Sequence, residues 1–587
     1  MMDDPARVIA ALIEDAQPVL AAAPEPQPEA DDDPFQHEGD SGLGEDGPPP
    51  NDFDPEIIAA NAGLDQNDTD NGKRLLRLFG DRFLNVREIG LHAWEGRFWQ
   101  LEGGDHEVER CAQDTARLMK IEAQWIFPPP GAQALIDRAN ALREKPDDQL
   151  SADEKKEIEA GLSAADALKK RREGRRKFAI SCGNRGRTVA MITQALPHRT
   201  ISPAALDSDA MRFNVANGTL VFSRNERRER DLECPDPEQD RWLTETHASV
   251  VMVPHNPEHR ISKMGGAGYD PEARAPLWTA FMERFQPDTA QRRFLQVAAG
   301  RSLIGGASTQ VLIFLYGDGA NGKSVFMETL AQLCGDYAGR LKPESITGTM
   351  EQSGDKASPD FARLQGKRFV AIAELPRGAP MREGLVKTMT GSEPMPVRHL
   401  NKGFFDMVPE FIPFMSGNQM PEIGGLDKGI WRRLKFVKWP ITLADEEQRP
   451  LPKVVSEFMA EGPGILNWLI EGALIFLREG LKDPPSVREL TQSHREDSDP
   501  VGAFIGACVK AHPGDMVPAR EMYGGFSKWC EANAIKPWGE KTFSLALKQK
   551  GLTREDKRYR TRMWLDVTLH NLPDDPQPAD AGARYGR

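Results

Sequence analysis

Residues 310–333 read QVLIFLYGDGANGKSVFMETLAQL, and this stretch decides the fold. An apolar run suited to a buried parallel strand leads into an octapeptide that fits GxxxxGK(S/T), and a helical pattern follows it. Glycines in such a loop let backbone N–H groups wrap phosphates, and the helix N-terminus adds partial positive charge. The sequence therefore predicts a nucleotide-binding loop formed by Gly317, Asp318, Gly319, Ala320, Asn321, Gly322, Lys323 and Ser324.

Two groups of this loop, and one strand beyond it, predict ATP chemistry. We expect Lys323 to reach the β- and γ-phosphates of ATP and the Ser324 hydroxyl to ligate Mg²⁺. A second apolar strand, residues 369–373, ends in Glu374, which would lie beside the metal and polarise the attacking water. Ala373 takes the place of a second acid, so the metal would depend more on Ser324 and water. A surface carboxylate at a strand end is the alternative for Glu374.

Two further segments supply polar groups of the same kind. A third strand, residues 410–416, ends in Gly417 and Asn418, and an Asn there can orient water against the γ-phosphate, although a plain turn residue is the alternative. Arg432 and Arg433 precede another apolar strand, and an arginine from a neighbouring subunit stabilises transition-state charge. Adjacent strand residues face opposite ways, so we expect one of the two to point at phosphate, with a surface salt-bridge pair as the alternative.

Two basic regions predict contacts with DNA. Residues 396–407 form two short strands around an Asn-x-Gly turn, which indicates a β-hairpin with a basic tip, or else an ordinary exposed hairpin. Residues 500–572 form a compact basic module with three helices and a polar wing, which suits DNA or a protein partner. The residues expected on phosphates are Arg398, His399 and Lys402 in the hairpin, and Lys541, Lys548, Arg558, Arg560 and Arg562 in the module.

The order of these parts resembles the superfamily-three helicases, most of all the phage, plasmid and poxvirus primase–helicase group. The resemblance spans roughly residues 70–570 and rests on GDGANGKS, the strand-end AE, GSEPMPVRHLNKG, SGNQMP and DKGIWRRL, with NVANGTLVF and YDPEARAPLW upstream and REMYGGFSKWCEANAIKPWGEKTFSLALKQKGL downstream. It implies a ring, usually hexameric, with an AAA-like ATPase that translocates on single-stranded DNA. It also implies that Glu374 is the Walker B acid, Asn418 the sensor, Arg433 rather than Arg432 the finger, and Lys402 the hairpin contact.

The expected fold class is a multidomain α/β protein: an AAA-like P-loop ATPase with a mixed α/β N-terminal domain, a helical collar and a C-terminal winged helix. The predicted parts are a disordered acidic tail (1–70), the N-terminal domain (71–265), the collar (266–305), the ATPase (306–485), the winged helix (495–572) and a polar tail (573–587). Nothing before Gly317 looks like a polymerase metal site. A separate primase, or another replication protein, is therefore an expected partner.

Charge is unevenly distributed along the 587 residues. The net charge is −14, but residues 1–70 hold 19 acidic residues against the single base Arg7, so the remainder is slightly positive. Residues 21–54 offer almost nothing to bury, which is typical of disorder, and we expect ordered sequence to begin near Lys73. Residues 169–177 (KKRREGRRK) are the densest basic cluster, either a solvated helix face or a phosphate contact.

Composition excludes several other classes. No run approaches the ~18 apolar residues that a membrane span needs, and the acidic start is unlike a secretory signal. The six cysteines lie far apart without a CxxC pair, which argues against a zinc knuckle and for reduced thiols. We therefore expect a cytoplasmic protein with no membrane partner, in the host cytoplasm if a phage encodes it.

The sequence favours a replicative DNA helicase of a phage, plasmid or other mobile element, driven by ATP. An ATP-switched DNA-binding initiator or helicase loader without processive unwinding is the first alternative, and a P-loop kinase for a small substrate is the second. The arginine pair and the basic C-terminal module argue against the kinase.

Overall fold

The computed structural model describes residues 54–230, 242–306, 309–348, 359–375, 379–398, 404–424, 428–558 and 561–573. Apart from Asp54, all of these residues belong to one compact unit that begins at Pro55. Its first helices are α2 (Pro55–Ala62) and α3 (Asp68–Phe79). Ordered sequence was expected to begin near Lys73, after a disordered tail of residues 1–70. Both boundaries are wrong, because α2 and α3 begin earlier in the chain. Ile58 and Ala62 are buried, and Asn67 caps α3 through the backbone N–H of Asp70.

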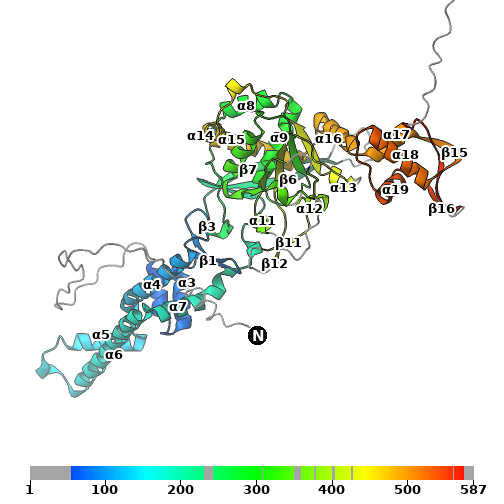
Figure 1. Cartoon of the computed structure of the whole chain (residues 1–587). Helices are drawn as coiled ribbons and strands as arrows, with labels where there is room; N and C mark the ends of the chain where they lie inside the picture. The colour runs from blue at the N-terminus through cyan, green and yellow to red at the C-terminus, as the bar shows by residue number, and fades with distance from the viewer. Residues whose placement is uncertain are drawn as a thin grey trace, which may run out of the picture. The chain divides into compact units, whose positions relative to one another are not determined.

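Helices and a small sheet make up the next part of the chain (Figure 1). The sheet has the order β3-β2-β1-β4, and β2 and β3 form a hairpin whose turn lies at Glu95-Gly96. The strands are β1 (Phe83–Val86), β2 (Gly90–Trp94), β3 (Trp99–Gln100) and β4 (Thr200–Ile201). The helices are α4 (Gly104–Glu122), α5 (Pro130–Leu142), α6 (Ala152–Cys182) and α7 (Arg185–Ala195).

Three buried charged residues, Arg74, Glu122 and Arg175, stabilise this helical region. Glu122, with no exposed side-chain surface, accepts from Arg74 at 3.1 Å and from Arg175 at 2.5 Å. The same two arginines donate to backbone carbonyls near the end of α2, including that of Leu64. Arg172 donates to the Ile126 carbonyl. Arg172 and Arg175 of the 169–177 cluster therefore stabilise the helical region through internal hydrogen bonds and are not ligands for phosphate.

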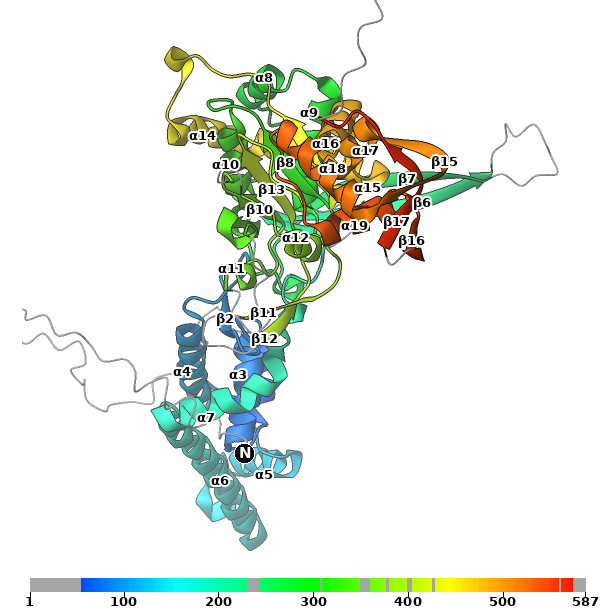
Figure 2. The ribbon, with the colours of Figure 1, turned by 45° about the vertical axis from the view of Figure 1, so that its right-hand side comes forward.

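An antiparallel sheet follows next in the chain, before the central region. Its strands, in the order β5-β6-β7, are β5 (Arg212–Val215), β6 (Gly218–Arg230) and β7 (Trp242–Val253). β5 and β6 pair as a hairpin, with Val215 opposite Gly218. Figure 2 shows β6 and β7 as a long two-stranded ribbon.

The central sheet is parallel throughout, with the order β14-β8-β13-β10-β9. Its strands are β8 (Leu312–Tyr316), β9 (Ala338–Leu341), β10 (Phe369–Ile372), β13 (Ile412–Gly417) and β14 (Leu434–Lys438). Alternate residues of β8 enter two different core clusters, because both faces of the sheet are covered. The helices around it are α8 (Pro276–Phe285), α9 (Thr289–Gly300), α10 (Lys323–Cys334), α14 (Leu451–Ala460), α15 (Gly462–Glu479) and α16 (Pro485–Asp497).

Helices α8 and α9, expected as a separate collar, share one core with the sheet. Trp278 of α8 stacks on Phe326 of α10 at 5.8 Å between ring centroids, and Phe281 lies 6.3 Å from Trp439 after β14. The boundaries predicted for the collar and the ATPase stay predictions. Shorter elements complete the region: α11 (Pro359–Ala362), α12 (Glu383–Met389), α13 (Lys428–Trp431), and the antiparallel pair β11 (Met395–Arg398) and β12 (Phe404–Met407).

The C-terminal region forms a core of its own around Phe504, Phe526, Phe543 and Trp564. In chain order it contains α17 (Pro500–Cys508), β15 (Val509–Pro518), α18 (Ala519–Ala532), α19 (Glu540–Gln549), β16 (Arg554–Arg558) and β17 (Thr561–Leu569). The strands form an antiparallel sheet ordered β15-β17-β16. The three expected helices are present, and the polar stretch after them forms β16 and β17, whereas β15 was not predicted. Among the described residues, no helix is both long and apolar enough to span a bilayer.

Candidate nucleotide-binding site

The glycine loop predicted from the sequence runs from the end of β8 to the start of α10. Ala320 (φ 53°) and Gly322 (φ 81°) adopt left-handed backbone, which bends the loop before Lys323 begins the helix. A Cβ on Gly322 would lie 2.9 Å from the ring of Phe281. Glycine is therefore required there both by the backbone angle and by the close approach of α8.

Lys323 is the best-defined side chain of the site and is 5% exposed. Its Nζ donates to the carbonyls of Gly317 at 2.6 Å and Asp318 at 3.2 Å, and to Oδ1 of Asn418 at 3.2 Å. Burial lowers the pKa of Lys323 to about 8, although the charges of Glu374 and Asp318 oppose the shift. The ammonium is held among oxygen atoms that phosphate oxygens could replace.

Three neighbouring strands deliver the polar groups to one edge of the sheet. β8, β13 and β10 lie side by side and run parallel, so the glycine loop, Asn418 and Glu374 all follow their carboxyl ends. Glu374 is exposed and faces the same cavity as Lys323 and Ser324. The structure therefore brings together the residues that the sequence predicted for phosphate, metal and water.

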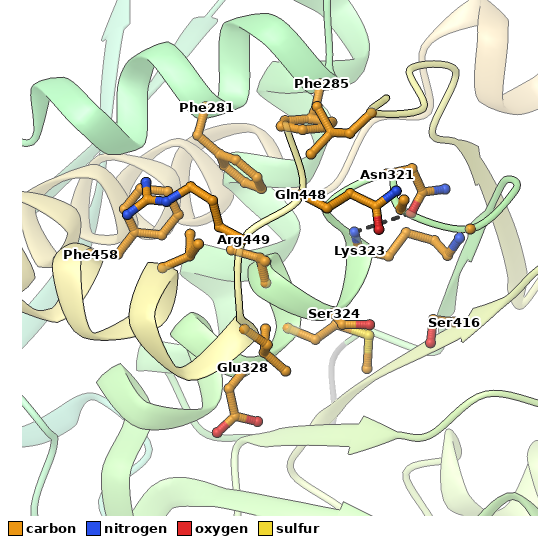
Figure 3. A pocket seen from close by; sticks show the side chains of 18 of the residues that line it. Phe281, Phe285, Asn321, Lys323, Ser324, Glu328, Ser416, Gln448, Arg449 and Phe458 are labelled. Atoms are coloured by element: carbon orange, nitrogen blue, oxygen red, sulfur yellow. Dashed lines mark hydrogen bonds between the residues drawn. The ribbon is translucent and has the colours of Figure 1, made fainter. Parts of the chain in front are cut away.

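A cavity of about 780 Å³ extends from these groups toward α8 and α14. Figure 3 shows Lys323, Ser324 and Ser416 at one end and the rings of Phe281, Phe285 and Phe458 at the other. Its size and apolar end suit the base and sugar of a nucleotide. Sequence reasoning missed Phe281 and Phe285 as site residues, since the helical spacing of LWTAFMERF indicates core packing and nothing more.

The segment that joins β14 to α14 also lines this cavity. The backbone N–H of Leu443 donates to the Ala320 carbonyl at 2.9 Å, which fixes the segment to the glycine loop. Glu447 pairs with Arg284 of α8, and Arg449 pairs with Glu457 of α14. This wall of the cavity is therefore built from α8, α14 and the segment between β14 and α14, and α8 is distant from the other two in the sequence.

Arg432 and Arg433 do not line this cavity. They precede β14, which runs parallel to β8 with Leu434 opposite Leu312, so they lie at the amino end of the strands. The five residues of β8 separate that edge from the glycine loop by about 15 Å. Arg432 is exposed, whereas Arg433 is 9% exposed and donates to the Gly429 carbonyl at 2.8 Å; both donate to Oε1 of Gln310 at 3.2 Å.

The hairpin predicted before the third strand is present as β11 and β12. Val397 and Met407 are buried, which anchors its base in the core that also covers one face of the sheet. Arg398 stacks over the ring of Phe404 at 4.8 Å. His399 and Lys402, expected at its tip, lie outside the described residues.

In the C-terminal region, three of the predicted phosphate contacts share one groove. Lys541 and Lys548 of α19 and Arg562 of β17 line it, together with Arg554 of β16, which sequence reasoning missed. Arg560 and the side chain of Arg558 lie outside the described residues. The guanidinium of Arg554 lies over the Trp564 ring at 5.6 Å, so part of its position is set by the module's core.

Comparison with protein families gives two matches, one on each side of the sheet region. Residues 72–287 match the family described as "D5 N terminal like", and residues 496–568 match "Poxvirus D5 protein-like". Two regions of the chain therefore match family models that are described by the name D5. The predicted resemblance to the poxvirus group of helicases and primases is thereby confirmed.

Several viral proteins are similar to this chain. Putative helicase 022R of Frog virus 3 is 27% identical over 271 residues, and Putative helicase L207/L206 of Acanthamoeba polyphaga mimivirus is 28% identical over 272 residues; each match covers 43% of this chain and 28% of the relative. Putative primase C962R of an African swine fever virus isolate is 22% identical over 308 residues, covering 48% and 32%. The chain thus spans less than a third of the length of these relatives.

Among solved structures, the apo structure of the NrS-1 C-terminal region (305–718) matches with a TM-score of 0.34 and 12% identity. The match covers 51% of this chain and 77% of that one.

Proposed function

We propose that the chain is an ATP-driven DNA helicase of the superfamily-three type that works as a ring on single-stranded DNA during replication of a viral or other mobile genome. One observation carries the proposal: the Lys323 ammonium is shared between the glycine loop and Asn418 at the edge of a cavity that Glu374 also lines. The two D5-like regions support the same assignment.

The side chains divide the work of hydrolysis. When triphosphate enters, Lys323 exchanges the carbonyls of Gly317 and Asp318 for phosphate oxygens and neutralises their charge. Glu374 accepts a proton from the attacking water, and Asn418 orients that water through its amide. Phe281 and Phe458 exclude solvent from the base.

The donor set suits Mg²⁺, which binds proteins through one or two oxygen ligands and keeps substrate phosphates and waters in its shell. Ser324 and Glu374 would hold it, since the hydroxyl and the carboxylate line one cavity. Among the described residues no group of three or more His, Cys, Asp or Glu side chains could hold an ion, so phosphate must complete the site. The metal would neutralise charge on the β- and γ-phosphates.

Each site is completed by a neighbouring subunit. Arg432 and Arg433 lie at the far edge of their own sheet, so in a ring they would face the triphosphate of the next copy. The exposure of Arg432 favours it as the finger, and the burial of Arg433 favours an anchoring role. This reverses the preference for Arg433 drawn from the resemblance.

DNA would meet the chain at two places. The β11–β12 hairpin, anchored at its base, suits a loop that moves with the sheet and grips one strand. The C-terminal order of helix, strand, two helices and two further strands supports an assignment as a winged helix, with α19 and the β16–β17 wing on the duplex.

A fork-unwinding assay tests the proposal. Lys323→Ala is expected to abolish ATP hydrolysis and strand separation while DNA binding persists, because Lys323 is not among the residues that line the basic groove of α19. Strand separation retained by that variant would contradict the proposal. A wild-type chain that hydrolyses ATP and binds DNA but never opens a fork would instead be an ATP-switched initiator.

A further inference from the structure

Helix α19 of the C-terminal region has two contrasting faces. Phe543, Ala546 and Leu547 are buried in the module's core. The opposite face is formed by residues three and four positions apart, which therefore lie side by side on the helix: Lys541, Ser544, Leu545 and Lys548.

Leu545 stands out on that face because it is 58% exposed. It helps to line a groove of about 370 Å³ between α19 and the strands β16 and β17, together with four cations and, among the side chains that the structure describes, the single acid Glu540. Lys541 and Lys548 form no ion pair with any residue that the structure describes. A large apolar side chain is thus presented at the edge of a cationic groove, and it also borders a neighbouring pocket lined by Trp538 and Asp499.

We infer that α19 reads the base edges of duplex DNA in the major groove, with Leu545 against a thymine methyl group and Ser544 hydrogen-bonded to a neighbouring base. The inference rests on the proposed DNA binding of this module and deepens it. Lysine contacts to phosphate position a protein but carry no sequence information, whereas apolar contacts to the thymine methyl group do. The major groove, about 12 Å wide, admits one helix.

The charges on the groove decide between DNA and a protein partner. A docking surface for a protein would present several apolar side chains with few charges at its centre. Here the apolar contribution is Leu545, and Lys541, Lys548, Arg554 and Arg562 all line the same groove. Four cations around one methyl-sized contact match a base step flanked by two phosphate backbones.

The test is a selection of duplexes from a random pool with the full chain, followed by affinity measurements on the enriched duplex. We expect a thymine-containing motif to be enriched. Replacing the critical thymine with deoxyuracil, which lacks the methyl group, is expected to weaken binding about fourfold. Leu545→Ala should bind both duplexes equally, with the salt dependence of the wild type.

A matched control is Ile535→Ala, which truncates another exposed apolar side chain of the module outside the groove. It should keep the wild-type preference for thymine. Wild-type binding to duplexes without any enriched motif, or an unchanged thymine preference in Leu545→Ala, would overturn the inference and leave DNA binding standing. Failure to bind any duplex at low salt, with capture of a protein instead, would overturn both this inference and the proposed DNA binding of the C-terminal region.

Discussion

The Nζ of Lys323 lies 3.2 Å from Oδ1 of Asn418, although 95 positions separate the two residues in the chain. The contact joins the glycine loop after β8 to the end of the adjacent strand β13. It turns the Asn418 carbonyl toward the lysine and leaves its amide nitrogen for water or phosphate. Asn418→Ala is expected to reduce the rate of ATP hydrolysis about 100-fold with a small change in nucleotide affinity, measured by steady-state turnover and equilibrium binding. A loss confined to affinity would contradict this role.

The lowered pKa of Lys323 predicts a proton uptake on nucleotide binding. Near pH 7 the ammonium is already charged, but above its pKa of about 8 the free site is mostly neutral, and a bound triphosphate restores the charge. Affinity should therefore fall about tenfold per pH unit above pH 8. Calorimetry at pH 9 in two buffers of different ionisation enthalpy measures the uptake.

Lys323→Arg serves as the control for that titration, because a guanidinium stays charged across this range. Its binding should show no proton uptake at pH 9. Equal uptake by the wild type and by this variant would assign the proton to another group.

Glu374→Gln is expected to separate binding from hydrolysis. The amide is nearly isosteric with the carboxylate but cannot accept a proton, so turnover should drop by about 10²- to 10⁴-fold while ATP still binds. Filter binding with ATP and a phosphate-release assay give the two measurements. Hydrolysis at the wild-type rate would make Glu374 a surface carboxylate.

The positions of the two arginines predict complementation in mixed assemblies. Arg432→Ala and Lys323→Ala should each be inactive alone, and mixing them should restore part of the ATPase activity, because some interfaces then hold an intact lysine and an intact arginine. Arg433→Ala should instead lower thermal stability, since its contact with the Gly429 carbonyl is lost. No recovery at any mixing ratio would argue against shared sites.

The buried triad predicts a large effect on folding. Glu122→Gln removes the charge that compensates Arg74 and Arg175, and the free energy of unfolding should fall by about 3–5 kcal/mol in urea denaturation. Glu157→Gln breaks an exposed pair with Arg138 and should change it by less than about 1 kcal/mol. Similar losses for both variants would contradict the assigned role of burial.

The parts predicted correctly were those with a local signature. The glycine loop, the strands that end in Glu374 and Asn418, and helix α19 each follow from residues close together in the sequence. Strand β15 was missed because Pro513 and Gly514 interrupt it and read as a loop. A register shift between Ala511 and Met516 accommodates them.

Features that depend on distant partners could not be predicted. The spacing of Phe281 marks it as a core residue, but only the folded chain places its ring beside Gly322. Arg175 sits in a run that reads as solvated charge, and its burial depends on Glu122 from another helix. Helix α2 was missed because Asp52, Asp54 and Glu56 beside it read as a continuation of the acidic tail.

If the arginines at one edge of the sheet act only on the next copy, a lone molecule lacks part of its own machinery. Turnover per chain would then decline on dilution and climb steeply as copies accumulate, rather than remain constant. A cell holding few copies would consume almost no ATP through this protein, and ATP use would start once enough chains had assembled.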